Sequence, residues 1–416
     1  PTIPEELDYG RLCELVLPDE SRDDRFYCLN NFMDSFEFRN LGPKGRQTVL
    51  TKKIPGGGLS DIADVCSRDS GSRDDENPAP GKVSNVVIRR MSEDEAIEVA
   101  RAVYRTYGYS YGYEQVYFPE SLARLNRKDE IITAVAVDEL GAVVGTLSIM
   151  RWDENSTVAE IGQGVVIPSY RNSGIFSKLV DFQIDNAISC GLKAFFALAV
   201  TNHTFSQKTA SRFNGKDCAL LLNYIPSSVH FRGFDRSWHG RISVVVHYTD
   251  LEPGSQNIIY PPTKHEFFIQ EIYRSLDRQV IIGSSNATHH AAPCAELNSH
   301  LKVIPALRYA RITVNAYGGD FIKYLRKTVR ELLFHDVEII NLFLNLSDPS
   351  TATFAASSEE SGFFFAGILP RAAMGNDALV LQYLKGTPIN YEEIKIASEF
   401  GRKILDYVRR HDPNWR

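Results

Sequence analysis

The sequence has no paired-cysteine motif and no long apolar run. Its cysteines are scattered along the 416 residues without CxxC spacing, which is typical of reduced thiols in a large intracellular protein rather than of a disulfide framework. No window approaches the roughly eighteen consecutive apolar residues of a membrane span, and no signal-peptide pattern opens the chain. We therefore expect a cytoplasmic protein without a membrane partner.

An excess of positive charge is also lacking. The formal net charge is -6, and the Lys/Arg clusters are too short for the basic stripe of a nucleic-acid binder. Metal-ligand residue types gather at His289, His290, Cys294 and His300, but their spacing matches no common zinc pattern. The composition thus predicts neither a nucleic-acid partner nor a bound metal.

The length of the chain favours more than one domain. Residues 56–82 are rich in Gly, Ser, Asp and Pro and lack apolar periodicity, which predicts a flexible linker. We expect a small α+β segment over 1–55, with a helix and then two strands joined at 41–45, and two folded domains over 83–252 and 253–416. Because the chain begins with Pro rather than Met, we also expect further residues upstream.

Apolar patterns of strand and helix period alternate between residues 84 and 250. The predicted order is β-α-α-β-β-β-α-β-α-β, with a capping box at Ser92 and Glu95 opening the first helix. This order is typical of an α/β fold with a mixed sheet flanked by helices. From residue 310 the second half of the order recurs and ends in a helix over 391–411, which predicts a tandem pair of domains.

A polar turn lies between a predicted strand and a predicted helix, in the sequence PSYRNSGIFSKL over residues 168–179. Backbone N–H groups at a helix N-terminus converge on an anion where no side chain obstructs them, and Gly174 leaves that space open. The turn and its flanking elements resemble the R/Q-x-x-G-x-G/A motif of the GNAT family of acyl-CoA-dependent N-acetyltransferases, with Phe176 at the last small position. The resemblance implies that acetyl-CoA is bound by Val165, Val166, Ile167, Arg171, Asn172, Ser173, Gly174, Ile175, Phe176 and Ser206.

Many GNAT enzymes carry their general base as a glutamate on the strand before this motif. Glu160 occupies the corresponding position, so the resemblance implies that it deprotonates the acceptor amine. Strand alternation puts Gly162 and Gly164 on the same face as Glu160, which leaves room for a substrate. The alternative is a surface carboxylate on a half-exposed strand.

The family's usual general acid is a tyrosine shortly before a glycine, and Phe213 stands in its place. Phenylalanine has no hydroxyl to donate, so the acid role stays open among His203, Ser206 and Tyr224. Each of the three residue types is also common as an ordinary loop or core residue.

The connection between the first two helices is rich in tyrosine. The family commonly roofs its acceptor pocket here, so we expect Tyr107, Tyr109, Tyr111 and Tyr113 to bind the acceptor. Tyrosines offer flat apolar faces with hydroxyl handles, which suits a peptide or an amine with an apolar or aromatic body. The alternative is that half of these rings pack the helix against the sheet.

The remaining regions carry weaker versions of known patterns. The second domain resembles a degenerate GNAT fold, because its turn AYGGDFIKYL has no arginine and places Asp320 at the helix start, where aspartate is a good N-cap and repels a pyrophosphate. We expect this domain to pack against the first or to shape its acceptor site. Residues 1–55 resemble the end of a GHKL ATPase of the anti-sigma-factor kinase kind, through Asp8, Gly10 and the final hairpin, but without its Mg-ATP helix.

These resemblances imply a bacterial acetyl-CoA-dependent N-acetyltransferase, in which a small-molecule amine or a peptide attacks the acyl group directly with Glu160 as base. The alternative, from a different class, is a regulatory module that binds CoA or a protein without chemistry and is linked to anti-sigma-type signalling. The N-terminal segment is the candidate contact for a protein partner or a homodimer.

Overall fold

The computed structural model describes residues 35–40, 46–51, 85–107, 111–153, 156–227, 240–254, 256–283, 296–386 and 389–415. The chain divides into two compact units, 1–79 and 80–416. In the first unit, β1 (Ser35–Asn40) and β2 (Arg46–Thr51) pair antiparallel, as the sequence predicts for this segment. The predicted helix before them, and Asp8 and Gly10 of the GHKL-like pattern, lie outside the described residues.

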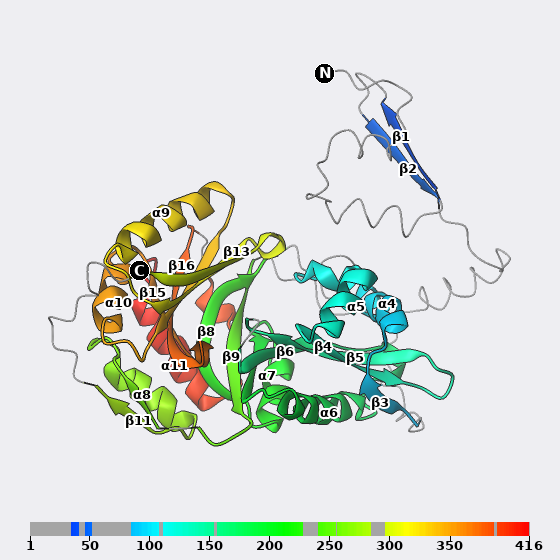
Figure 1. Cartoon of the computed structure of the whole chain (residues 1–416), viewed down its shortest axis with the longest axis horizontal. Coiled ribbons are helices and arrows are strands. Elements are labelled where there is room, and N and C mark those ends of the chain that lie inside the picture. The colour runs from blue at the N-terminus through cyan, green and yellow to red at the C-terminus, as the bar shows by residue number, and fades with distance from the viewer. Residues whose placement is uncertain are drawn as a thin grey trace. The chain divides into compact units, whose positions relative to one another are not determined.

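The second unit is built on a sheet in which twelve strands are described, with helices packed on it (Figure 1). The strand order is β12-β13-β14-β16-β15-β8-β9-β7-β6-β5-β4-β3, with both parallel and antiparallel neighbours. This architecture confirms the predicted α/β class. The strands are β3 (Val87–Arg90), β4 (Ile131–Val137), β5 (Val143–Arg151), β6 (Val158–Val166), β7 (Ala194–Val200), β8 (Lys216–Ile225), β9 (Ile242–Asp250), β12 (Asn298–Ile304), β13 (Tyr309–Ala316), β14 (Ile339–Asn345), β15 (Phe364–Ala373) and β16 (Asn376–Leu384).

Helices cover both faces of the sheet. They are α4 (Ala96–Tyr107), α5 (Pro119–Arg127), α6 (Ile175–Ser189), α7 (Phe205–Arg212), α8 (Glu266–Ser275), α9 (Phe321–Phe334), α10 (Thr351–Glu359) and α11 (Glu399–His411). The alternation of β4 shows how the faces divide, because Val135 and Val137 pack with α4 and α5, whereas Ala134 and Ala136 pack with α6. No helix among the described residues is long and apolar enough to span a membrane.

The predicted capping box is present at the start of the first helical segment. Ser92 and Glu95 exchange the two capping interactions, and the Glu95 carboxylate also accepts two hydrogen bonds of 2.6 Å from the Arg89 guanidinium on β3. These contacts satisfy the first N–H groups of the helix and tie its start to the sheet edge.

Several elements differ from the sequence prediction, among them a separate two-stranded parallel sheet of β10 (Asn257–Ile259) and β11 (Val280–Ile282) that the sequence pattern does not indicate. The sequence pattern gives no strand over β9, and β12 forms in a stretch expected to be a polar connection. β12 lies at the edge of the sheet and pairs only with β13 among the described strands. Because its other edge is not covered by a described strand, it does not need the apolar pattern of a buried strand. The last helix begins at Glu399 rather than at residue 391, because the Ser398 hydroxyl caps it by accepting from the Gly401 N–H at 2.7 Å.

The large sheet has a first half, β3 to β9, and a second half, β12 to β16, and the two halves have the same local topology. In each, a hairpin strand inserts beside the second of two parallel strands, giving β7-β9-β8 in one half and β14-β16-β15 in the other. The halves join where β8 meets β15 at Ala219 and Gly367, and a Cβ on Gly367 would lie 2.3 Å from the Cys218 carbonyl oxygen. The second compact unit thus holds both predicted domains on one sheet, and the tandem repeat remains a prediction.

Candidate active site

The parallel strands β6 and β7 separate partway along their length. They pair only over Val158–Glu160 and Ala194–Phe196, whereas β7 stays paired with β9 to its end. Gln163 has a left-handed backbone (φ 55), and the register of β6 against β5 shifts at the same place, which marks a β-bulge. The bulge bends β6 away from β7 and opens a gap beyond Glu160.

Two cavities meet at this gap, one of about 810 Å³ and one of about 490 Å³. On β7, Phe196 lines only the larger cavity, whereas Phe195 and Ala197 line only the smaller one. Because successive side chains of a strand point to opposite faces, the cavities lie on opposite faces of the sheet. Both are lined by Gly112, Tyr113, Glu160, Gln163, Leu198 and Tyr224.

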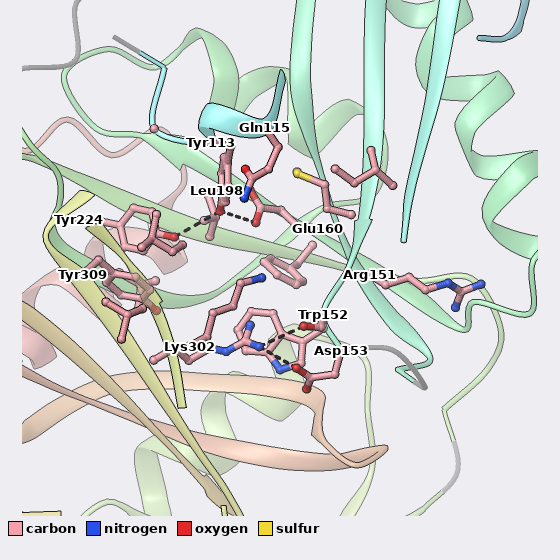
Figure 2. Close-up of a pocket in the computed structure, with 18 of the residues that line it drawn as sticks. Tyr113, Gln115, Arg151, Trp152, Asp153, Glu160, Leu198, Tyr224, Lys302 and Tyr309 are labelled. Atoms are coloured by element: carbon pink, nitrogen blue, oxygen red, sulfur yellow. Dashed lines mark hydrogen bonds and ion pairs between the residues drawn. The ribbon is translucent and has the colours of Figure 1, made fainter. Parts of the chain in front are cut away.

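Glu160 sits where the two cavities meet, hydrogen-bonded to one tyrosine that contacts a second (Figure 2). The Tyr113 hydroxyl donates to Glu160 Oε2 at 3.0 Å and lies 3.5 Å from the Tyr224 hydroxyl. When Tyr113 donates its proton to the ionised carboxylate, Tyr224 is the donor in the second contact. The three groups form a hydrogen-bonded chain across the gap.

The pKa of Glu160 is raised from 4.5 to about 7. Burial is the main cause, because desolvation disfavours the charged carboxylate; the Tyr113 hydrogen bond and the positive charges of Lys302 and Arg311 oppose it. The carboxyl is therefore close to half ionised at neutral pH, where a general base works best.

The three candidates for the general acid fall in different places. Tyr224 lies at the gap, and burial raises the pKa of its hydroxyl, so it holds its proton at neutral pH. His203 lines the smaller cavity, but its Nδ1 accepts from the Phe205 N–H at 3.2 Å and burial lowers its pKa, so the ring is mostly neutral. Ser206 lines the same cavity with a buried hydroxyl that has no hydrogen-bond partner among the described residues. Phe213 lines it as well, without a polar group to offer.

The larger cavity is built from both halves of the second unit. Trp152 and Phe196 line it from the first half, and Lys302, Tyr309 and Arg311 on β12 and β13 line it from the second. The connection after α4 closes against the second half, since a Cβ added at Gly112 would come within 2.3 Å of the Leu307 side chain.

Four tyrosines were predicted to bind the acceptor, and the structure separates them. Tyr113 lines both cavities, whereas Tyr107 and Tyr111 line only the smaller one, with ring centroids 4.9 Å apart. Both of these rings also pack against the core beneath α4. Tyr109 lies outside the described residues.

The smaller cavity is mainly apolar and has Phe176 in its wall. The Phe176 ring lies over Gly164, where an added Cβ would be only 2.7 Å from the ring. The large side chain at the last small position of the motif therefore points into the protein and leaves the exposed turn clear.

The turn before α6 has the shape of an anion-binding loop. Asn172 (φ 61) and Gly174 (φ 78) both have left-handed backbones, and Gly174 opens directly into the helix, whose first N–H groups have no intrahelical acceptor. Arg171 is exposed, and its Nε donates to the Val166 carbonyl at 3.3 Å, which holds the guanidinium beside the turn. The Ser173 hydroxyl donates to the Tyr170 carbonyl.

Other residues predicted to bind the cofactor contribute mainly to packing. The side chains of Val165 and Ile175 are buried in the core, and those of Val166 and Ile167 are half-buried against it. Their side chains hold β6 and α6 in place, so any contact they make with a ligand in the turn would come from their backbone.

The corresponding region of the second half is closed. There β13 and β14 pair over six positions, from Tyr309 with Ile339 to Val314 with Leu344, so no comparable gap opens. Tyr317 stacks on Phe354 with ring centroids 4.7 Å apart, and its hydroxyl contacts Thr351 Oγ1 at 2.9 Å. Asp320 stands at the N-cap of α9, as predicted, but makes no capping hydrogen bond with its side chain.

Several lining residues of the larger cavity carry no sequence signal for function. Lys302 lies on the unpredicted strand β12, and Trp152, Tyr309 and Arg311 sit in or beside ordinary apolar strands. His300 lines this cavity too, with its Nδ1 3.7 Å from Asp153, whereas the other His and Cys residues of the metal-like group lie outside the described residues. Only pairing of β12 with β13 brings these groups toward Glu160.

Comparisons with known proteins found similar solved structures and one family model that matches part of the chain. Solved structures similar to this chain include an N-acetyltransferase from Staphylococcus aureus Mu50 (19% identity, 41% of this chain and 100% of that one, TM-score 0.33). Another is the spermidine/spermine N-acetyltransferase SpeG from Vibrio cholerae (11% identity, 40% and 94%, TM-score 0.33). No curated protein sequence matches the chain. Residues 96–213 match the model of the Acetyltransferase (GNAT) family, which confirms the predicted resemblance for this part of the chain.

Proposed function

We propose that this protein is an acetyl-CoA-dependent N-acetyltransferase acting on an amine. The observation that carries the proposal is the position of Glu160, a carboxyl with a pKa of about 7 at the junction of two cavities on opposite faces of the sheet. This arrangement lets a donor and an acceptor approach one base from opposite sides. The family match over residues 96–213 supports acetyl transfer as the reaction class.

The smaller cavity and the turn before α6 fit acetyl-CoA. The left-handed turn at Asn172 and Gly174, with Arg171 beside it, would hold the pyrophosphate. The apolar cavity would hold the pantetheine arm, and the buried hydroxyl of Ser206, which bonds to no described residue, offers a hydrogen bond inside it. When bound, the cofactor supplies an activated acyl group as a thioester.

The residues at the gap have separate roles in proton transfer. Glu160 removes the proton from the acceptor ammonium, and the Tyr113 hydrogen bond stabilises the carboxylate that does so. Tyr224 retains a proton at the gap and is the proposed general acid in place of the missing tyrosine at Phe213. Holding both reactants at the gap supplies much of the rate by proximity, without a covalent acyl-enzyme.

The second half of the unit has a supporting role in this proposal. We interpret it as a degenerate second GNAT-like domain, because the sheet topology recurs while the gap and the arginine do not. Its strands β12 and β13 complete the larger cavity, which we assign to the acceptor.

Calorimetric titration with acetyl-CoA, followed by a screen of amines and peptides for CoA release, tests the proposal. We expect one site per chain, lost in Arg171→Glu and retained in Arg105→Glu, a matched charge change at an exposed position on α4. Binding that survives Arg171→Glu contradicts the assigned turn. Binding without turnover of any acceptor favours the alternative, a regulatory module.

A further inference from the structure

Two cations stand directly opposite each other in the wall of the larger cavity. Lys302 on β12 and Arg311 on β13 are partners in the antiparallel register, and both line this cavity. Like charges directly opposite on neighbouring strands repel and destabilise the pair. The fold therefore maintains an unfavourable juxtaposition at a wall that faces a ligand-sized space.

Arg311 is only partly neutralised by its surroundings. Its guanidinium lies 3.5 Å from the centre of the Trp152 ring, and Nη2 donates to the Trp152 carbonyl at 3.0 Å and to Asp153 Oδ1 at 2.9 Å. The residue is 4% exposed, yet its Nε has no hydrogen-bond partner within the described part of the chain. A buried guanidinium donor without an acceptor is costly unless a ligand supplies one.

Lys302 forms no ion pair with any described residue, and its ammonium points into the cavity on the side of Glu160 (Figure 2). The Lys302 side chain is exposed to solvent at the cavity. Partial desolvation by the cavity wall, together with the positive charge of Arg311, lowers its pKa.

The charges around Lys302 indicate the charge of the ligand that would fit the larger cavity. Lys302 and Arg311 contribute two positive charges, and Asp153 supplies one negative charge at the wall. Glu160 has a pKa of about 7 and so compensates only in part at neutral pH. The other Lys, Arg and Glu residues that line the cavity balance one another, Lys128 and Arg151 against Glu114 and Glu130, so the surplus is at most one positive charge. A surplus of that size matches a singly charged anion such as a carboxylate.

We propose that Lys302 and Arg311 form a carboxylate-binding subsite and that the acceptor is an amino acid with an aromatic or apolar side chain. This inference rests on the proposed function and names its substrate class. The carboxylate lies at Lys302 with the amino group toward Glu160. The side chain then extends along the apolar wall formed by Trp152, Phe196, Tyr309 and Phe343.

The test compares phenylalanine with phenethylamine, which differ by the carboxylate alone. With the full chain and saturating acetyl-CoA, we expect kcat/KM for phenylalanine to exceed that for phenethylamine by roughly 10- to 100-fold, the range for a charge-assisted hydrogen bond. Lys302→Met should remove most of this preference and Lys302→Arg should restore part of it. Lys128→Met, at another lysine that lines the cavity, should keep the preference.

Three results would overturn the subsite: equal kcat/KM for the two amines in the wild type, an unchanged preference in Lys302→Met, or an acetyl group found on Lys302 by peptide mass spectrometry. If neither amine is acetylated, the proposed function fails for this class, and calorimetric titration of each amine into the protein tests the subsite separately. Phenylalanine binding that Lys302→Met weakens supports the subsite, and equal binding of both amines contradicts it.

Discussion

The proposed general base Glu160 carries a cost in stability, and the Glu160→Gln variant tests both that cost and the proposed role. Raising the pKa of a carboxyl from 4.5 to about 7 corresponds, at about 1.36 kcal/mol per pH unit, to on the order of 3 kcal/mol. The folded state binds the proton more tightly than the unfolded state. The contribution of Glu160 to the free energy of unfolding is therefore largest below pH 4.5 and is lost as the pH rises through 7.

The Glu160→Gln variant carries no ionisable group at this position, so it should not lose stability over that range. We expect it to melt about 4 °C above the wild type at pH 8, from the unfolding entropy of a unit of this size, and close to the wild type at pH 4.5. Its turnover should fall by roughly 10²- to 10⁴-fold, because the base is lost.

The assay is thermal unfolding of both proteins at the two pH values, alongside initial rates at saturating substrate. Glu139→Gln, which alters an exposed carboxylate that lines neither cavity, is the control and should change neither quantity. A variant that melts with the wild type at pH 8 refutes the desolvation of Glu160. Undiminished turnover refutes its role as base.

Other predictions concern the same gap. The value of kcat/KM should rise with pH through about 7 as Glu160 ionises, measured as a pH–rate profile. Tyr113→Phe should move that rise to higher pH, because it removes the hydrogen bond that lowers the pKa of Glu160; an unshifted or downward-shifted profile contradicts the contact. Gly164→Val should weaken acetyl-CoA binding in calorimetry by about tenfold or more, because the new side chain pushes the Phe176 ring into the smaller cavity. Full affinity in that variant would place the cofactor elsewhere.

Local patterns in the sequence predicted much of the first half of the site. The strand before the turn, the capping box of Ser92 and the turn at Gly174 depend on neighbours within a few residues, so the sequence reveals them. The orientation of Phe176 could not be predicted, because it depends on the bulge that brings Gly164 beneath the ring.

The acceptor side of the site depends on contacts between segments far apart in the chain. Tyr224 comes to Glu160 from β8. Lys302 comes from the edge strand β12, whose polar residues obscure the apolar alternation that would predict a strand. Tyr224 is brought there by the pairing of β8 with β9 and of β9 with β7. Lys302 is brought there by the pairing of β8 with β15 and of β12 with β13. No local periodicity specifies these pairings. The same pairings place Lys302, Tyr309 and Arg311 of the second half in the wall of the larger cavity.

Product analysis with isotopically labelled acetyl-CoA tests the central claim most directly. If donor and acceptor meet at Glu160 from opposite faces of the sheet, the label should pass to the acceptor nitrogen as an amide, and the intact mass of the protein should stay unchanged throughout the reaction. A labelled protein, or label that reaches only water in the presence of every amine tried, would contradict direct transfer across the gap.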